Sequence, residues 1–334
     1  RAKTAVILLN WNGEQDTLDC IEATNDQSVE HDIIVVDNNS SDNLVSVVKK
    51  EHPDIAVIEN DENLGFAGGV NTGIRYAQEN SYQYVALINN DAKPDKTWLK
   101  ELLTVAEDKK AGIVTGRLLK TDETLDSTGE MYTSWGLAYP RGRNQSDSTL
   151  YNHTEEVFGA TGGASLYRIE TLKDIGQFDE DFFAYYEDVD LSFRAQLAGW
   201  KVIYTPKAIA YHKIGASSDK VPGLTTYMTI KNLPWLFWKN VPLQLMPKIL
   251  PRFTIAYTSI VISSLAKGKI IPVFKGLFVS TVKLPKKLLE RHKIQKNRKV
   301  SGNYIKSMIT YDLPPNAAKL KKVRSILKKL RFWR

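Results

Sequence analysis

The feature that most constrains the fold is a series of four short apolar runs, each of which stops at polar residues. The runs cover residues 4–9, 32–37, 55–58 and 84–88. They are rich in Val, Ile and Leu along their full length, which is typical of strands buried on both faces. More polar segments separate them, and we expect helices that end near residues 25 and 78. This alternation predicts an α/β domain with a mainly parallel central sheet covered by helices.

Polar side chains follow the carboxyl ends of these predicted strands. Asn10 and Asp91 follow two of the runs, Asp37 is the last residue of a third, and Asn63 opens a glycine-rich turn into the next helix. In open α/β sheets, ligands bind outside the carboxyl ends of the strands. We therefore expect these four residues to lie around one ligand. The glycine-rich turn resembles a phosphate-cradling loop, which is a weak signal when it stands alone.

The alternation weakens after residue 111. Residues 112–119 are predicted to form another strand, and residues 120–156 are polar and irregular enough to be a loop excursion over the site. Residues 158–169 look extended, and residues 187–198 are predicted to form a helix that Gly199 ends. With 334 residues, the chain has room for one large domain and a smaller one. The single Cys20 excludes an internal disulfide and a cysteine-based metal cluster.

Charge is distributed very unevenly along the chain. Residues 221–334 contain 24 Lys or Arg and two acids, a formal net charge of +22, whereas residues 1–220 carry −15. We expect a catalytic domain at 1–220 and a basic, mostly helical extension at 221–334. Such an extension favours an anionic partner, either a membrane surface or nucleic acid.

The extension is predicted to lie on a membrane without crossing it. Its longest apolar run, residues 253–266, has fourteen residues, and a spanning helix needs about 18 or more. Residues 319–334 place four apolar side chains on one helical face with basic residues around them, which suits a helix in the lipid interface. These four are Leu320, Val323, Leu327 and Leu330. A solvated charged face and self-association as a homo-oligomer are the alternatives for this segment.

Asp91 and His212 are candidate metal ligands. Mg²⁺ is commonly held by one or two carboxylates together with substrate phosphates, and an imidazole suits Mn²⁺ somewhat better. Taken alone, Asp91 could be a solvated turn residue and His212 a packed histidine. Asp37 could accept a hydrogen bond from a nucleotide or simply form a strand-end turn.

Glu187 and Asp188 open a predicted helix, where the helix dipole favours acidic side chains whatever their function. A carboxylate at this position can also deprotonate an attacking hydroxyl. Four aromatic residues precede the pair and could form either a sugar-stacking floor or part of the core. They are Phe182, Phe183, Tyr185 and Tyr186.

Five motifs in order resemble family 2 glycosyltransferases, and most closely the branch with rhamnosyltransferases of bacterial surface polysaccharides and galactofuranosyltransferases. The motifs are VILLNWN at 6–12, VVDNNSSD at 35–42, ENLGFAGGVN at 62–71, LINND at 87–91 and YEDVDLSFR at 186–194. The resemblance covers about residues 4–215. It implies a GT-A fold, a nucleotide-sugar donor, a divalent cation (Mn²⁺ or Mg²⁺) and inversion at the anomeric carbon.

The resemblance also implies roles for individual residues. Asp91 matches the last position of the family's Asp-x-Asp metal motif, His212 matches a histidine that ligates metal in some relatives, and Asp188, second of the pair with Glu187, matches the catalytic base. The first position of the metal motif is Asn89, which we interpret as a marker of the rhamnosyl-like branch. The donor-binding residues predicted on this basis are Asn10, Trp11, Asp37, Asn39, Asn63, Gly65, Phe66, Asn71 and Asn90.

The sequence therefore predicts an inverting glycosyltransferase acting on a lipid-linked glycan from the cytoplasmic face of the cell membrane. The favoured donor is dTDP-rhamnose, with a UDP-sugar (galactofuranose, glucose or GlcNAc) as the alternative. A sugar-1-phosphate nucleotidyltransferase is disfavoured because residues 10–14 lack the basic residues of an activating loop. A nucleic-acid-binding protein that uses the basic extension is the non-enzyme alternative, although no nucleic acid is expected. An inactive glycosyltransferase-like scaffold is a further alternative.

Overall fold

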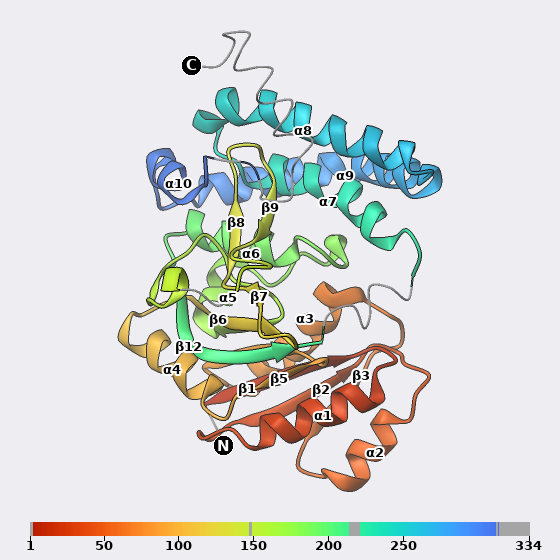
Figure 1. Ribbon diagram of the computed structural model, residues 1–334, viewed down its shortest axis with the longest axis vertical. Coiled ribbons are helices and arrows are strands. Elements are labelled where there is room, and N and C mark those ends of the chain that lie inside the picture. Colours follow the sequence, from red (N-terminus) through yellow and green to blue (C-terminus); the bar gives the residue numbers. More distant parts are fainter. Residues whose placement is uncertain (1–2, 147–148, 214–220, 312, 314–334) are drawn as a thin grey trace. The chain divides into compact units, whose positions relative to one another are not determined.

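The computed structural model describes residues 3–146, 149–213, 221–311 and 313, and these residues form two compact units (Figure 1). Unit 1 consists of Arg1–Glu130 and Pro140–Pro222, and unit 2 of Met131–Tyr139 and Gly223–Arg334. The strongly basic segment predicted at 319–334 lies outside the described residues.

Unit 1 is built on a ten-stranded mixed sheet in the order β10-β12-β6-β11-β4-β1-β2-β3, with β5 paired to β12 and β7 paired to β6. β4, β1, β2 and β3 are parallel neighbours, and β6 is parallel to β12. The strands are β1 (Thr4–Asn10), β2 (Asp32–Asp37), β3 (Ala56–Glu59), β4 (Tyr84–Asn89), β5 (Ala92–Pro94), β6 (Ile113–Lys120), β7 (Leu125–Ser127), β10 (Glu155–Glu156), β11 (Ala164–Arg168) and β12 (Val202–His212). The four apolar runs and residues 112–119 are thus strands, as predicted.

Helices cover both faces of this sheet. Successive side chains along β1 and β2 point to opposite faces, so each strand contributes to two separate buried clusters. Val6, Leu8 and Val35 share a buried cluster with residues of α1 (Glu14–Asn25), α2 (Leu44–Glu51) and α4 (Trp98–Asp108). Ile7 and Ile34 share a second cluster with residues of α3 (Gly65–Glu79), α5 (Ile169–Ile175) and α6 (Glu187–Leu197). The predicted fold class, an α/β sheet covered on both faces, is confirmed.

The region after residue 111 is more ordered than the sequence suggests. The excursion at 120–156 contains β7, the hairpin of β8 (Glu130–Tyr132) and β9 (Ala138–Pro140), the 3₁₀ turn η1 (Thr149–Tyr151) and β10. The segment at 158–169 is a strand only over β11, which runs antiparallel to β4 and β6. Because β11 is antiparallel to β4, its first residues lie at the carboxyl end of β4, which brings them to the predicted site edge.

Unit 2 is helical around a small aromatic core. Its helices are α7 (Leu224–Asn240), α8 (Met246–Ala266), preceded by the 3₁₀ turn η4 (Leu243–Leu245), α9 (Ile270–Lys296) and α10 (Gly302–Met308). The ring of Phe237 on α7 stacks on that of Phe253 on α8 with centroids 4.6 Å apart. The Trp235 indole N–H donates to the Ser280 carbonyl oxygen at 2.9 Å, which ties α7 to α9.

The apolar helix of unit 2 is longer than the fourteen residues expected from the sequence. Residues Leu243–Ala266 form a continuous helical stretch of 24 residues. Its most apolar window of 18 residues has a mean hydropathy of 1.4, and 17% of that window is buried. By length and composition alone this helix could cross a membrane, although single helices of soluble proteins meet the same criteria. The argument against a span that rested on helix length is therefore wrong. Pro247 lies in the first turn, where proline is tolerated, so the helix begins earlier than the apolar run.

Candidate active site

The carboxyl ends of β1 and β2 lie side by side, since Asn10 is the register partner of Asp37. The Asn10 side-chain amide donates to the Asp37 carboxylate at 2.9 Å and to the Ser40 hydroxyl at 3.0 Å. The other Asp37 oxygen accepts the Ser40 backbone N–H at 2.9 Å. These hydrogen bonds hold a buried carboxylate at the strand edge, where the sequence placed a nucleotide contact.

The loop that carries Trp11 is joined to the loop that carries Asn39. The Asn12 side chain accepts the Ser41 backbone N–H at 2.8 Å, and the Asn12 backbone N–H donates to the Ser40 hydroxyl at 3.0 Å. Asn39 is exposed with φ of +58°, and Trp11 is half-buried. Both predicted donor residues thus lie at the mouth of the same strand edge as Asp37.

Asn63 and Gly65 shape the start of α3. The Asn63 side chain accepts the Asn38 amide at 3.0 Å and the Gly65 backbone N–H at 2.9 Å. Gly65 has φ of +69°, and a Cβ there would lie 2.5 Å from the Phe183 carbonyl oxygen, so only glycine fits. The Ala67 backbone N–H donates to that same Phe183 oxygen at 3.0 Å. The N-terminus of α3 is therefore held against the loop that precedes α6.

Asn71 and Asn90, which were predicted to bind the nucleotide sugar, form hydrogen bonds within the protein. The Asn71 amide donates to the Phe178 carbonyl oxygen at 2.8 Å and its oxygen accepts the Phe178 N–H at 3.1 Å, so both polar atoms bind a loop. The Asn90 amide donates at 2.9 Å to the hydroxyl of Thr17 on α1. The half-buried Phe66 lies against Gly162, which precedes β11. Contact of these residues with a donor stays a prediction.

Asp91 and His212 come together although 121 positions separate them in the sequence. β12 ends at His212 beside β5, whose first residue follows Asp91. The His212 Nε2 atom lies 3.1 Å from the Asp91 Oδ1 atom and 3.5 Å from the Asn89 amide nitrogen. Both predicted metal ligands and the first position of the metal motif thus share one corner of the sheet edge.

Asp126 on β7 completes this corner and was not predicted from the sequence. Its buried carboxylate lies 2.8 Å from His212 Nδ1, and the guanidinium of Arg143 lies 2.8 Å from its other oxygen. Burial of His212 opposes its positive charge, but the hydrogen bonds with Asp126 and Asp91 outweigh this and raise the pKa of His212 to about 9. With Asp126 accepting the Nδ1 proton, loss of the Nε2 proton would leave the Nε2 lone pair directed toward Asp91.

The corner fits a divalent cation. A carboxylate oxygen, an imidazole nitrogen and an amide side chain converge there, and Mn²⁺ accepts both oxygen and imidazole ligands. A carboxylate that orients the far nitrogen of a ligating histidine is a common companion of such sites. The single carboxylate, Asp91, leaves coordination positions for phosphate oxygens of a substrate, which is how Mg²⁺ and Mn²⁺ are often held.

Asp188 lies in the first turn of α6, where its carboxylate accepts the backbone N–H groups of Gly162 at 2.9 Å and Val189 at 2.8 Å. Burial raises the pKa of Asp188, and these backbone hydrogen bonds only partly offset the rise. Phe183, Tyr185 and Tyr186, just before the helix, all have positive φ, which is unfavourable for side-chain-bearing residues. Such strain is often found where a loop must present a functional group.

A short chain of contacts connects Asp188 to the corner formed by Asn89, Asp91 and His212. Gly163 follows Gly162, and its carbonyl oxygen accepts the Asn89 backbone N–H at 2.9 Å. A Cβ on Gly163 would lie 3.1 Å from the Asn89 amide nitrogen. The two glycines before β11 therefore bring the start of α6 next to the end of β4, as the proposed chemistry requires.

Two further acids lie near Asp188. Glu187 is buried at the first position of α6. Glu130, which sequence reasoning missed, is buried and exchanges both backbone hydrogen bonds with Gly159, at 2.7 and 3.1 Å. Burial, and then the negative charge of Asp188, raise the pKa of Glu130 well above its usual value. The site thus contains several carboxyl groups, and the positive charge of Arg143 offsets part of their negative charge.

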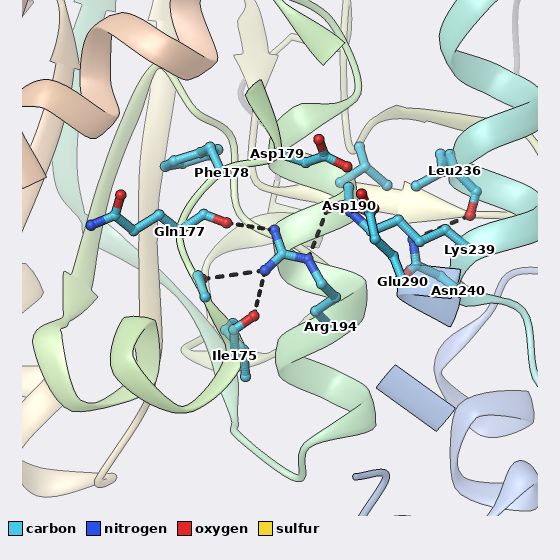
Figure 2. Close-up of polar contacts among 12 residues, drawn as sticks. Ile175, Gln177, Phe178, Asp179, Asp190, Arg194, Leu236, Lys239, Asn240 and Glu290 are labelled. Atoms are coloured by element: carbon cyan, nitrogen blue, oxygen red, sulfur yellow. Dashed lines mark hydrogen bonds and ion pairs between the residues drawn. The ribbon is translucent and has the colours of Figure 1, made fainter. Parts of the chain in front are cut away.

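Asp190, two residues after Asp188, has a structural role instead. Its carboxylate lies 2.8 Å from the Arg194 Nε atom, one helical turn later. The Arg194 guanidinium also donates to the carbonyl oxygens of Ile175 at 2.7 Å and Gln177 at 2.9 Å, as Figure 2 shows. This buried ion pair fixes α6 against the end of α5 and so fixes the orientation of the Asp188 turn.

Comparison with known proteins identifies the family. The sequence pattern described as Glycosyl transferase family 2 matches residues 5–176, slightly more than half of the chain. This range contains β2 to β4, all of β1 except its first residue, Asp91 and the glycine pair at 162–163, whereas Asp188 and His212 lie beyond it. The chain belongs to glycosyl transferase family 2.

Curated relatives are enzymes of glycan synthesis. The low-salt glycan biosynthesis hexosyltransferase Agl10 of Haloferax volcanii is 27% identical over 198 residues, 58% of this chain and 61% of that protein. The N-acetylglucosaminyl-diphospho-decaprenol L-rhamnosyltransferase of Mycobacterium tuberculosis is 26% identical over 211 residues, 57% of this chain and 69% of that protein. The chain spans about three-fifths of the length of the Haloferax relative.

Solved structures share the fold at low identity. The mannosyltransferase PcManGT of Pyrobaculum calidifontis, in complex with GDP-Man and Mn²⁺, superimposes with a TM-score of 0.54 at 16% identity. The match covers 89% of this chain and 86% of that one. GalNAc-T7, with UDP, GalNAc and Mn²⁺, gives a TM-score of 0.57 at 12% identity, covering 71% of this chain and 47% of that one. These neighbours confirm the GT-A fold.

Proposed function

We propose that this chain is an inverting, metal-dependent glycosyltransferase that moves rhamnose from dTDP-rhamnose to a hydroxyl of a lipid-linked glycan. The proposal depends on one observation, that distant segments of the chain meet at one edge of the sheet. Asp91 lies beside His212, and Asp188 is connected to Asn89 through Gly162 and Gly163. A relative named for transfer of L-rhamnose to a diphospho-decaprenol glycan supports this choice of donor and acceptor.

Each residue would have a defined task. Asp91 and His212 would hold a divalent cation, which supplies positive charge for the diphosphate leaving group. Asp188 accepts the proton of the acceptor hydroxyl, and burial makes its carboxylate a stronger base than an exposed aspartate. Asp37, in the hydrogen-bond network of Asn10 and Ser40, contacts the nucleotide.

The product geometry follows from a single displacement. The hydroxyl oxygen forms a bond to the anomeric carbon as the bond to the diphosphate oxygen breaks on the opposite face, which inverts the configuration. The hydroxyl proton passes to Asp188, and no covalent enzyme intermediate forms. The basic C-terminal region would keep the enzyme on the cytoplasmic face of the membrane, where a lipid-linked acceptor is presented.

A panel of nucleotide sugars tests the proposal. Donor hydrolysis is measured with dTDP-rhamnose, UDP-galactofuranose, UDP-glucose and UDP-GlcNAc, each with Mn²⁺, with Mg²⁺ and with chelator. We expect turnover of dTDP-rhamnose that chelator abolishes. Turnover of a UDP-sugar but not of dTDP-rhamnose would change the proposed donor and leave the proposed reaction class unchanged. Failure of every donor to bind or react would contradict the enzyme assignment.

A further inference from the structure

Helix α9 turns a continuous apolar stripe toward solvent. The five side chains of this α9 stripe follow one another at helical spacing, so they lie along one face for about 27 Å at 1.5 Å per residue. They are Ile271, Phe274, Phe278, Val282 and Leu289, with exposed fractions of 79, 58, 69, 60 and 70%. The opposite face, with Val273, Gly276 and Ser280, is buried. An exposed apolar strip of this length marks an interaction surface.

The stripe has a cationic border. α9 contains seven Lys or Arg and one acid, a formal net charge of +6. Lys275, Lys286 and Lys293 are exposed and fall along one edge of the stripe at helical spacing. The single acid, Glu290, lies 3.1 Å from the buried Lys287 and therefore does not neutralise that edge. Apolar side chains beside exposed lysines are the pattern of a helix that lies in a lipid interface.

A basic cavity of about 470 Å³ lies next to the end of the stripe. Its lining includes Leu243, Leu288, Arg291, His292, Lys296 and Arg298. Arg291 donates to the carbonyl oxygens of Trp238 at 2.9 Å and Val241 at 2.7 Å through Nη1. Its Nη2 atom is buried and has no hydrogen-bond partner among the described residues. Arg291 also lines the cavity, and a guanidinium forms strong, charge-assisted hydrogen bonds with anionic oxygens.

We propose that unit 2 binds an anionic lipid surface, with the α9 stripe at the headgroup–acyl boundary and a lipid phosphate in the Arg291 cavity. This inference rests on the proposed function, because it specifies how that enzyme would meet its membrane. Leu288 lines the cavity and Leu289 ends the stripe, so one ligand can supply both an apolar chain and a phosphate.

Helix α9 combines positive charge with apolar side chains, and this combination favours an anionic membrane over other partners. Nucleic acid would pair with the lysines but offers no apolar partner for Phe274 and Phe278. A second copy of the chain would cover the apolar stripe but would bring two helices of +6 charge together. An anionic membrane satisfies both properties of the surface.

Vesicle co-sedimentation of the full chain tests the stripe. Vesicles of phosphatidylcholine alone are compared with vesicles containing one-quarter phosphatidylglycerol. We expect Phe274→Ser combined with Phe278→Ser to weaken binding to the anionic vesicles about tenfold or more, because two aromatic side chains no longer leave water. Leu150→Ser, at an apolar residue of unit 1 that is 71% exposed, is the matched control and should bind like the unaltered chain.

A second variant tests the cavity. Arg298→Gln should lower affinity for the anionic vesicles about fivefold and leave binding to neutral vesicles unchanged. Equal binding by the stripe variant and the unaltered chain would overturn the proposal. So would stabilisation by inorganic phosphate without vesicle binding, a stripe-dependent dimer without vesicle binding, or a DNA complex that vesicles do not displace. Donor hydrolysis is measured in parallel with every variant, so loss of membrane binding and failure of the glycosyltransferase assignment are separate results.

Discussion

At the scale of single residues, α6 shows how two similar carboxylates acquire different roles. Asp190 is fully buried and paired with Arg194, so its charge serves the fold. Asp188 is half-buried, and among the described residues its carboxylate accepts the backbone N–H groups of Gly162 and Val189 and forms no ion pair. A carboxylate that is not directly paired with a cation keeps more of its basicity than one that is, and this difference makes Asp188 the better candidate for proton transfer.

Replacing Asp188 with Asn should abolish sugar transfer and keep donor binding. The amide cannot accept the hydroxyl proton, so we expect a loss of about 100-fold or more in transfer rate. Transfer is measured as product formation, and donor binding by calorimetry with Mn²⁺. Asp190→Asn serves as the contrast, because it leaves Arg194 unpaired and should lower the unfolding temperature. Full turnover by Asp188→Asn would refute the base assignment.

Replacing Asp126 with Asn should weaken Mn²⁺ binding about 10- to 100-fold. The amide no longer offers the charged acceptor that orients His212 through Nδ1. Binding is followed by the Mn²⁺ electron paramagnetic resonance signal in the presence of a nucleoside diphosphate, which does not depend on turnover. Asp122→Asn, the same change at an exposed residue nearby, is the control. Unchanged Mn²⁺ affinity in Asp126→Asn would show that Asp126 does not position the histidine.

The sequence identified Asp91 and His212 but not Asp126, and the reason is physical. Asp91 follows an apolar strand, a position where a side chain must emerge at the sheet edge. Asp126 lies in a polar, irregular stretch, and its candidate role depends on a contact with His212, 86 residues later. Glu130 is similar, because its burial depends on pairing with Gly159 and not on any local pattern.

At the scale of elements, the site depends on how α3 meets the loop before α6. Gly65→Ala should destabilise the protein, because a Cβ would collide with the Phe183 carbonyl oxygen in addition to the strain of a positive φ. We expect a loss of about 2–4 kcal/mol in the free energy of unfolding, measured by urea denaturation.

The matched control is Gly268→Ala. Gly268 also has a positive φ, +74°, but a Cβ there would meet no atom within 4 Å. It carries only the backbone strain and should cost about 1 kcal/mol. Equal losses in the two variants would show that the contact with Phe183 contributes nothing to stability.

Helices and strands were predicted correctly where their apolar pattern is uninterrupted. β2 was predicted to the residue because its apolar run is buried throughout. β12 was not predicted as a strand because Pro206 and Lys207 interrupt its pattern, at the place where its register with β6 shifts. The apolar run at 253–266 covers only part of α8, because Pro251 and Arg252 interrupt the apolar pattern within the helix.

At the scale of the whole molecule, charge separates along the chain. Residues 1–220 carry −15 and residues 221–334 carry +22, so the acidic part repels anionic lipid and the basic part attracts it. In the described residues the positive charge is accompanied by the apolar α9 stripe. Two forces of different salt dependence should therefore hold the protein on a membrane.

Salt should divide the two contributions to vesicle binding. Between 0.1 M and 1 M salt the Debye length falls from about 10 Å to about 3 Å, so attraction to anionic lipid fades, whereas burial of the α9 stripe persists. We expect binding of the unaltered chain to fall about tenfold over this range yet stay measurable, and the Phe274→Ser, Phe278→Ser variant to detach completely. Arg298→Gln should lose its defect at high salt, because the charge that it removes is then screened. Complete release of the unaltered chain at 1 M would mean that charge alone holds it, and the apolar stripe would then have no part in membrane binding.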